Sequence, residues 1–291
     1  MSLLHKACYV EHRMLRALRV CVFVGLFLAT APPEAQAEAE QGAAAVQDEA
    51  PKLPVLVMLI GGAARFRNIH LEVGDNAGGT EARTFETGAY FDFGWHLLIR
   101  PSARRSPRAS IQAIVVQIDG GSGIGLKVQP AGTGISLQTD TWRLLGQFGY
   151  LYPIDRLQVG GLVGVGGDVL SIDLNSVLPS SRIVYVRLGP AVAYDIVPSF
   201  FGFRADFGVR VPFFLGGLEE AYGKDGSGVG LDATATFGGR LDAGFTYAFR
   251  FIWEYYKLRF AGSAANVPAM GNGAKGNDHA ITLQVLFGWS L

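Results

Sequence analysis

The last eleven residues of the chain read ITLQVLFGWSL, from Ile281 to Leu291. Every odd-numbered position in this stretch is apolar, and every even-numbered position except Leu286 is polar or small. A period of two is typical of a β-strand with one apolar face and one polar face. An amphipathic strand of this length at the end of a chain favours the closing strand of a transmembrane β-barrel.

The amino end has the organisation of a secretory signal peptide. Three arginines precede an apolar run over residues 20–31, and Ala35 and Ala37 supply the small side chains that signal peptidase requires. The apolar run is shorter than the ~20 residues that a membrane-spanning helix needs. We therefore predict a cleaved signal peptide over residues 1–37, with Met14 as an alternative translation start.

The composition excludes several classes of protein. Both cysteines, Cys8 and Cys21, lie in the leader, so the mature chain would have no disulfide and no thiolate metal site. Removal of the leader would leave a slightly acidic chain, which does not attract nucleic acid. Charged residues make up 17% and hydrophobic residues 49% of the sequence. High apolarity without a long apolar run is typical of a barrel, in which apolar residues occupy alternate positions.

Residues 38–52 are acidic and rich in alanine, which predicts a flexible lead. Residues 53–291 then divide into about ten alternating segments, and we predict an all-β, antiparallel, up-and-down transmembrane barrel, with eight or twelve strands as alternatives. The alternation does not fix the phase of the third and ninth segments. The expected strands are 53–67, 84–100, 110–119, 141–152, 157–169, 184–196, 201–213, 231–247, 251–261 and 281–291.

The connections between these segments alternate in length, with a longer basic stretch over residues 101–109 as the exception. Short turns are expected at 153–155, 197–199 and 248–250, and long loops at 68–83, 120–140, 171–181, 215–230 and 262–278. Transmembrane barrels have tight turns on the periplasmic rim and long loops on the extracellular rim. The glycine-rich stretches 121–125 and 226–230 do not open helices, so we interpret them as parts of loops and not as phosphate-binding motifs.

This pattern resembles the small outer-membrane β-barrel proteins of Gram-negative bacteria, the broad class of OmpA-like, OmpX-like and opacity-type barrels. The resemblance covers residues 53–291, and Leu283, Val285, Phe287 and Trp289 match the alternating carboxyl-terminal signal of the class. The chain departs from that signal at Leu291, where the class usually has Phe. The resemblance implies an outer-membrane location and contact with outer-membrane lipid and lipopolysaccharide. It also implies assembly by the barrel-assembly machinery with periplasmic chaperones.

The faces opposite the apolar ones would line the lumen and carry charges of both signs. A barrel of this size is narrow enough for side chains to fill, and unpaired charge in a dry interior is costly. We therefore expect a salt-bridged plug, with a narrow ion-selective passage as the alternative. The expected lumen residues are Glu86, Asp92, Arg100, Arg143, Asp168, Arg187, Asp195, Arg204, Asp206, Arg210, Asp232, Arg240 and Asp242.

Two histidines flank the strands that close the barrel. His70 follows the first expected strand and His279 precedes the last, so both could meet near Asp278 at the outer rim. Such a tentative rim site would suit a metal or acid–base chemistry like that of the omptin proteases, which also have ten strands. Loop histidines are usually only solvated, and the chain has no omptin motif. We therefore predict no catalytic residue, no metal site and no cofactor.

These patterns predict an integral outer-membrane barrel of structural, adhesive or narrow-channel type, with specificity carried by long extracellular loops. One alternative is a barrel enzyme with its site at the rim. Another alternative is a secreted soluble barrel, similar to lipocalins, with its apolar face turned inward around a small ligand.

Overall fold

The described part of the chain is the barrel. The computed structural model describes residues 53–74, 79–103, 112–130, 137–172, 179–197, 200–262 and 273–291. The predictions for the signal peptide and the acidic lead lie outside these residues. Within them, no helix has both the length and the apolarity to cross a membrane.

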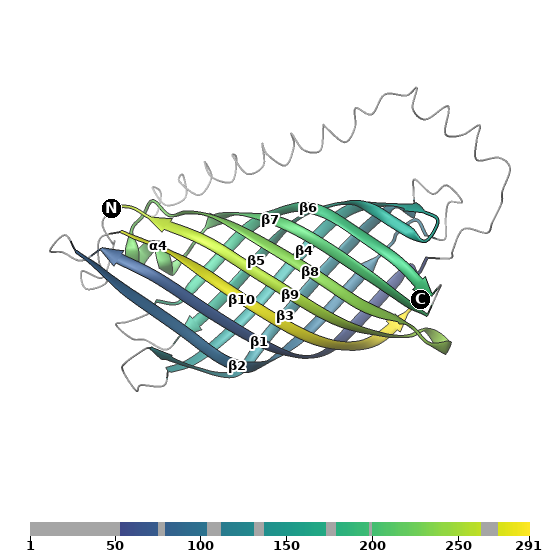
Figure 1. Cartoon of the computed structure of the whole chain (residues 1–291), viewed down its shortest axis with the longest axis horizontal. Coiled ribbons are helices and arrows are strands. Elements are labelled where there is room, and N and C mark those ends of the chain that lie inside the picture. Colours follow the sequence, from purple (N-terminus) through teal and green to yellow (C-terminus); the bar gives the residue numbers. More distant parts are fainter. Residues whose placement is uncertain are drawn as a thin grey trace, which may run out of the picture. The chain divides into compact units, whose positions relative to one another are not determined.

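Ten antiparallel strands close into one barrel in the order β1-β10-β9-β8-β7-β6-β5-β4-β3-β2 (Figure 1). The strands are β1 (Leu56–Gly74), β2 (Thr80–Ile99), β3 (Ile114–Pro130), β4 (Leu137–Ile154), β5 (Leu157–Ile172), β6 (Ser181–Val197), β7 (Phe201–Phe214), β8 (Ser227–Arg240), β9 (Phe245–Phe260) and β10 (Ala274–Ser290). A short helix, α4 (Gly217–Tyr222), follows β7, and a 3-10 turn, η2 (Asp242–Gly244), follows β8. The predicted all-β, ten-stranded up-and-down barrel is confirmed.

Pairing of β1 with β10 closes the sheet. The register runs from Val57 opposite Ser290 to Val73 opposite Ala274, and the Leu291 N–H donates to the Leu56 carbonyl at 2.9 Å. Each strand therefore has a hydrogen-bonded neighbour on both sides, which is the condition for a sheet to lie in lipid.

The outer wall of the barrel is apolar. On β10 the outward side chains include Leu283, Phe287 and Trp289, which are 50%, 47% and 59% exposed, whereas the inward Leu286 is fully buried. Along a tilted strand the span from Ile281 to Leu291 gives an apolar band about 25 Å tall, which is the height found in transmembrane barrels. An apolar surface of this extent around a closed sheet is suited to lipid and not to water.

The strands are longer than the sequence predicts on the side of the long connections. β3 continues through Gly121 and Gly123 to Pro130, and β8 already begins at Ser227, so the glycine-rich stretches, apart from Gly226, are strand and not loop. The physical reason is packing. A Cβ at Gly120 would lie 2.2 Å from the Trp95 side chain, and one at Gly121 would lie 2.7 Å from Arg143. Glycine here makes room for large neighbours inside a continuous sheet.

One predicted turn is wrong. Residues 248–250 lie within β9, and the turn between β8 and β9 is formed by residues 241–244, including η2. Ala243 adopts φ 61 and Gly244 φ 81 in this turn. The alternation of apolar residues continues through the turn, so hydrophobic periodicity alone could not locate it.

The apolar wall can be tested with two substitutions of the same residue type on one face. We expect Leu283→Arg to lower the free energy of unfolding by about 2–4 kcal/mol, because it places a guanidinium within the apolar band. Leu291→Arg, at the end of the same face, should cost only about 0–1 kcal/mol. Guanidinium titration of the barrel folded into lipid vesicles measures both values, and equal losses would contradict the assigned membrane position.

Candidate functional site

The interior of the barrel changes character along its axis. At the end with the long connections it is filled by an apolar group that we call the mouth cluster, which includes Leu71, Phe85, Leu170, Ile183, Tyr222, Leu258 and Phe260. The middle carries arginines and carboxylates. Near the short turns, smaller apolar groups form around Leu98 with Leu162 and around Leu59 with Leu286.

Helix α4 contributes to the mouth cluster. Its Leu218, Ala221 and Tyr222 are buried, and the Tyr222 ring packs 6.0 Å from that of Phe260. Burial raises the pKa of the Tyr222 hydroxyl, although Arg83 partly lowers it, so the ring stays a neutral phenol. Gly223 has φ 143, and a Cβ there would lie 2.4 Å from the Ala261 carbonyl oxygen. The chain therefore leaves α4 in a conformation that favours glycine.

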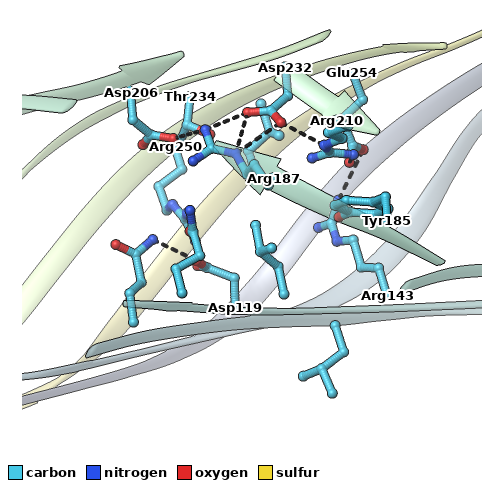
Figure 2. A pocket seen from close by; sticks show the side chains of 15 residues that line it. Asp119, Arg143, Tyr185, Arg187, Asp206, Arg210, Asp232, Thr234, Arg250 and Glu254 are labelled. Carbon is cyan, nitrogen blue, oxygen red and sulfur yellow. Dashed lines mark hydrogen bonds and ion pairs between the residues drawn. The ribbon is translucent and has the colours of Figure 1, made fainter. Parts of the chain in front are cut away.

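The central layer is an ion-pair network, part of which Figure 2 shows. Arg187 from β6 contacts Asp206 on β7 and donates from Nε to Asp232 on β8 at 2.9 Å. Arg210 on β7 donates to the same Asp232 at 2.6 Å and to Glu254 on β9 at 2.7 Å. Each carboxylate in this group thus accepts from one or two guanidinium groups, which are matched to it in shape and charge.

Two arginines of β1 extend the network across the lumen. Arg65 donates to Asp168 at 2.9 Å and to Glu254 at 3.1 Å, and Arg67 donates to Asp168 and Asp278, both at 2.9 Å. Both arginines are almost fully buried. Residues from β1, β5, β9 and β10 therefore meet near the barrel axis, where the network links opposite walls.

A second group lies closer to the short turns. Arg250 on β9 donates to Asp119 on β3 at 2.7 Å, and the His96 ring contacts the same carboxylate at 2.8 Å. Gln117 also donates to Asp119 at 2.6 Å. Between this group and the Arg187 group lies an internal cavity of about 40 Å³ (Figure 2). This volume is large enough to hold a few water molecules.

Most of the predicted lumen residues lie in the interior. Glu86 is an exception, because it is exposed on the outer wall and accepts from Asn68 at 2.9 Å. The register between β1 and β2 shifts between Arg65 and Arg67, so the inward phase of β2 changes and Phe85 points inward instead. The predicted lumen residues that lie on the inner face are Asp92, Arg100, Arg143, Asp168, Arg187, Asp195, Arg204, Asp206, Arg210 and Asp232.

The last two predicted lumen residues lie at the end of β8. Arg240 is exposed there, at the rim with the short turns. Asp242 belongs to η2, and its side chain lies outside the described part of the structure. The expected inward positions of both residues came from treating the turn as a continuation of the strand.

Sequence reasoning missed a large part of the network. Arg65, Arg67, Asp119, Arg250 and Glu254 were not predicted as lumen residues. The signal for the first two was present, because they alternate with the outward Ala64 and Phe66. The other three lie on β3 and β9, the strands whose phase the alternation did not fix.

The tentative rim site does not assemble. His70 and His279 lie on the outer wall within β1 and β10, where His70 contacts Thr84 at 2.9 Å and His279 accepts from the Trp253 ring N–H at 2.8 Å. Asp278 points to the opposite face of the sheet, where it binds Arg67. Neighbouring residues of a strand face opposite sides, so Asp278 cannot act with His279. The described residues contain no group of three side chains arranged to hold a metal ion.

Comparison with known proteins gives similarity of fold only. The barrel is similar to the outer-membrane protease OmpT from Escherichia coli, at 10% identity and a TM-score of 0.46, covering 81% of this chain and 96% of OmpT. It is also similar to an outer-membrane channel from Pseudomonas putida F1, at 10% identity and a TM-score of 0.37 over 83% of this chain and 99% of the channel. A FadL homologue from Pseudomonas aeruginosa matches at 7% identity and a TM-score of 0.29 over 79% of this chain and 90% of its own.

No family model matches the chain, and no curated protein matches it by sequence. The structural similarities are too low to transfer an activity or a site. The predicted resemblance to outer-membrane β-barrel proteins is confirmed at the level of architecture by the closed ten-stranded sheet.

The network predicts that two carboxylates contribute very differently to the free energy of unfolding. We expect Asp232→Asn to lower the free energy of unfolding by about 3–5 kcal/mol, because Arg187 and Arg210 would lose their shared buried counter-charge. The same change in Glu86→Gln should alter it by less than about 0.5 kcal/mol, because Glu86 is exposed. Denaturant titration in detergent micelles compares the two, and an equal effect would contradict the assigned faces.

Proposed function

We propose that this chain is an integral outer-membrane β-barrel protein whose lumen is closed to solutes and whose role is structural or adhesive. The charged interior and apolar exterior support a membrane location and disfavour the soluble lipocalin-like alternative, which requires the reverse arrangement. Three of the four connections on one rim are tight turns, the exception being residues 100–113 between β2 and β3. This arrangement supports the outer membrane, with the opposite rim on the extracellular side.

The observation that carries the proposal is the packing of the lumen. The mouth cluster fills one end, and the ion-pair network joins opposite walls in the middle. A hydrated ion crossing the barrel would have to displace guanidinium groups from their carboxylates, and each such pair is costly to break when buried. A narrow channel would need a continuous water-filled path, and the internal cavity is bounded by the ion-paired side chains of Arg187, Arg210 and Asp119.

A closed lumen leaves the outer surface and the long connections as the parts that can act on other molecules. The five connections opposite the tight turns lie on one rim, and α4 is held in that rim by the mouth cluster. We infer that the barrel serves as a rigid support for this surface. Rigid β-scaffolds that present loops are well suited to adhesion, because ordering the loop ends in advance lowers the cost of binding.

Conductance across a planar lipid bilayer tests directly whether the lumen is closed to ions. We expect the folded barrel, inserted in a planar lipid bilayer, to show no discrete conductance steps at moderate voltage. Heat-modifiable migration on a detergent gel confirms that the inserted protein is folded. Reproducible unitary steps from the folded fraction would overturn the closed-lumen proposal and favour the narrow channel.

A variant without α4 distinguishes the two barriers in the lumen, which are the mouth cluster and the ion-pair network. Replacement of residues 217–222 by a Gly-Ser linker removes α4 from the mouth cluster but leaves the ion-pair network unchanged. Because the network lies beneath the cluster, we expect this variant also to be non-conducting. Opening of the lumen by this change alone would show that α4 is the barrier and that the ion pairs leave a passage.

A further inference from the structure

The outer wall becomes polar above the apolar band on four adjacent strands, β9, β10, β1 and β2. The rings of Trp253 and Tyr255 stack at the boundary with centroids 6.2 Å apart, and Trp253 donates to His279 on the neighbouring strand. Amphipathic aromatic rings at the edge of an apolar band are typical of the headgroup layer of a membrane. The residues above this boundary therefore lie at headgroup height.

Two cations project outward above these rings. Lys257 and Arg259 on β9 are exposed, and each lies opposite a polar residue of β10, Asn277 and Lys275 respectively. Lys275 forms an ion pair of 2.9 Å with Glu72. Within the described part of the chain, Lys257 and Arg259 form no ion pair. They present positive charge to the membrane at the level where lipid phosphates lie.

A groove of about 240 Å³ lies on the same wall, lined by residues of β10, β1 and β2 and not by the two cations. Its lower part is lined by Phe66 and Ile281, and its upper part by Asn68, Glu86 and His279. The register shift between β1 and β2 shapes this groove, and a Cβ at the nearby Gly88 would meet no atom within 4 Å. The groove is therefore apolar toward the lipid chains and polar toward the headgroups.

We propose that this wall is a specific binding site for the phosphorylated glycolipid of the outer leaflet, the lipid portion of lipopolysaccharide. The inference rests on the proposed outer-membrane location and adds a defined site to it. Lys257 and Arg259 bind the phosphate, and Asn68, Glu86 and His279 bind sugar hydroxyl and amide groups. An acyl chain lies against Phe66 and Ile281.

The width of the site determines which class of lipid headgroup can fill it. From the cations on β9 to Glu86 on β2 the site crosses three strand spacings, about 14 Å at the usual separation of neighbouring strands. A phospholipid carries one small headgroup, which reaches either the cations or the groove. A phosphorylated disaccharide headgroup carries both anionic groups and hydroxyl groups across that width.

Among the described residues, the wall around β4 lacks this combination. On β4, Trp142 is 48% exposed at the same type of boundary, but the next outward residue toward the long connections is the acidic Asp140. Single exposed cations occur elsewhere on the upper wall, at Lys127 on β3 and Arg182 on β6. They provide a matched control, because they have the same charge and lie away from the residues that line the groove.

Binding to the folded barrel in detergent tests the site. Native mass spectrometry gives the affinity for bis-phosphorylated lipid A, for its dephosphorylated form and for phosphatidylethanolamine. We expect the double variant K257Q/R259Q to bind phosphorylated lipid A about tenfold more weakly, since two exposed charge contacts are lost. Its affinity for the dephosphorylated form should stay unchanged. The control K127Q/R182Q should stay within about twofold of the original protein for both forms.

A second variant tests the groove. E86Q with N68A should weaken binding of both forms of lipid A alike, because it removes contacts to the sugar and not to the phosphate. Equal losses in K257Q/R259Q and K127Q/R182Q would show that only general surface charge acts and would overturn the site. Binding of phosphatidylethanolamine as tight as that of lipid A would also overturn it. Because these measurements use folded protein in detergent, their failure with a protein that still fractionates in the outer membrane would remove the lipid site alone.

Discussion

Closure of the sheet by β1 and β10 is the constraint on which the rest of the structure depends. A strand edge in lipid would leave backbone N–H and C=O groups without partners, and water is not present to replace them. The pairing from Val57 with Ser290 to Val73 with Ala274 removes that edge over the whole length of the barrel. Closure also separates the two faces of every strand into a lipid surface and an enclosed lumen. Each side chain must then suit one of two very different environments.

The enclosed lumen explains why most of the interior charges occur as pairs. The inner face carries as many arginines as carboxylates among the described residues, namely Arg65, Arg67, Arg100, Arg143, Arg187, Arg204, Arg210 and Arg250 with Asp92, Asp119, Asp168, Asp195, Asp206, Asp232, Glu254 and Asp278. A buried charge without a partner would destabilise the barrel, so most of these side chains form ion pairs, whereas Arg100 and Arg204 donate to the neutral side chains of Gln158 and Gln117. The network also occupies the middle of the lumen. Charge balance and the proposed closure to solutes would therefore follow from the same packing.

The sequence predicts the fold well because lipid imposes a strict alternation on each strand. Ile281–Leu291 is the clearest case, since its odd-numbered residues all face outward in the structure. The site is predicted less well because side-chain alternation depends on an unbroken register. The register shift between β1 and β2 turns Glu86 outward and Phe85 inward, and no residue type at these positions signals the shift. Partners such as Arg65 and Glu254 are 189 residues apart, so only the closed fold brings them together.

Strand β9 shows why its phase could not be read from the sequence. In its lower half Arg250 and Glu254 point inward while Phe249 and Phe251 point outward, as expected for a charged lumen within lipid. In its upper half Tyr256, Leu258 and Phe260 point inward while Lys257 and Arg259 point outward.

The polarity of the two faces is thus exchanged near Trp253 and Tyr255, where the outer environment changes from lipid chains to headgroups. Above that height the outside is polar, so the inside can be apolar and can hold the mouth cluster around α4. A single alternating template fails for such a strand, because the template assumes one environment on each side. The exchange itself marks the membrane boundary. It also means that the outward cations of β9 and the buried apolar cluster behind them arise from the same change of surroundings.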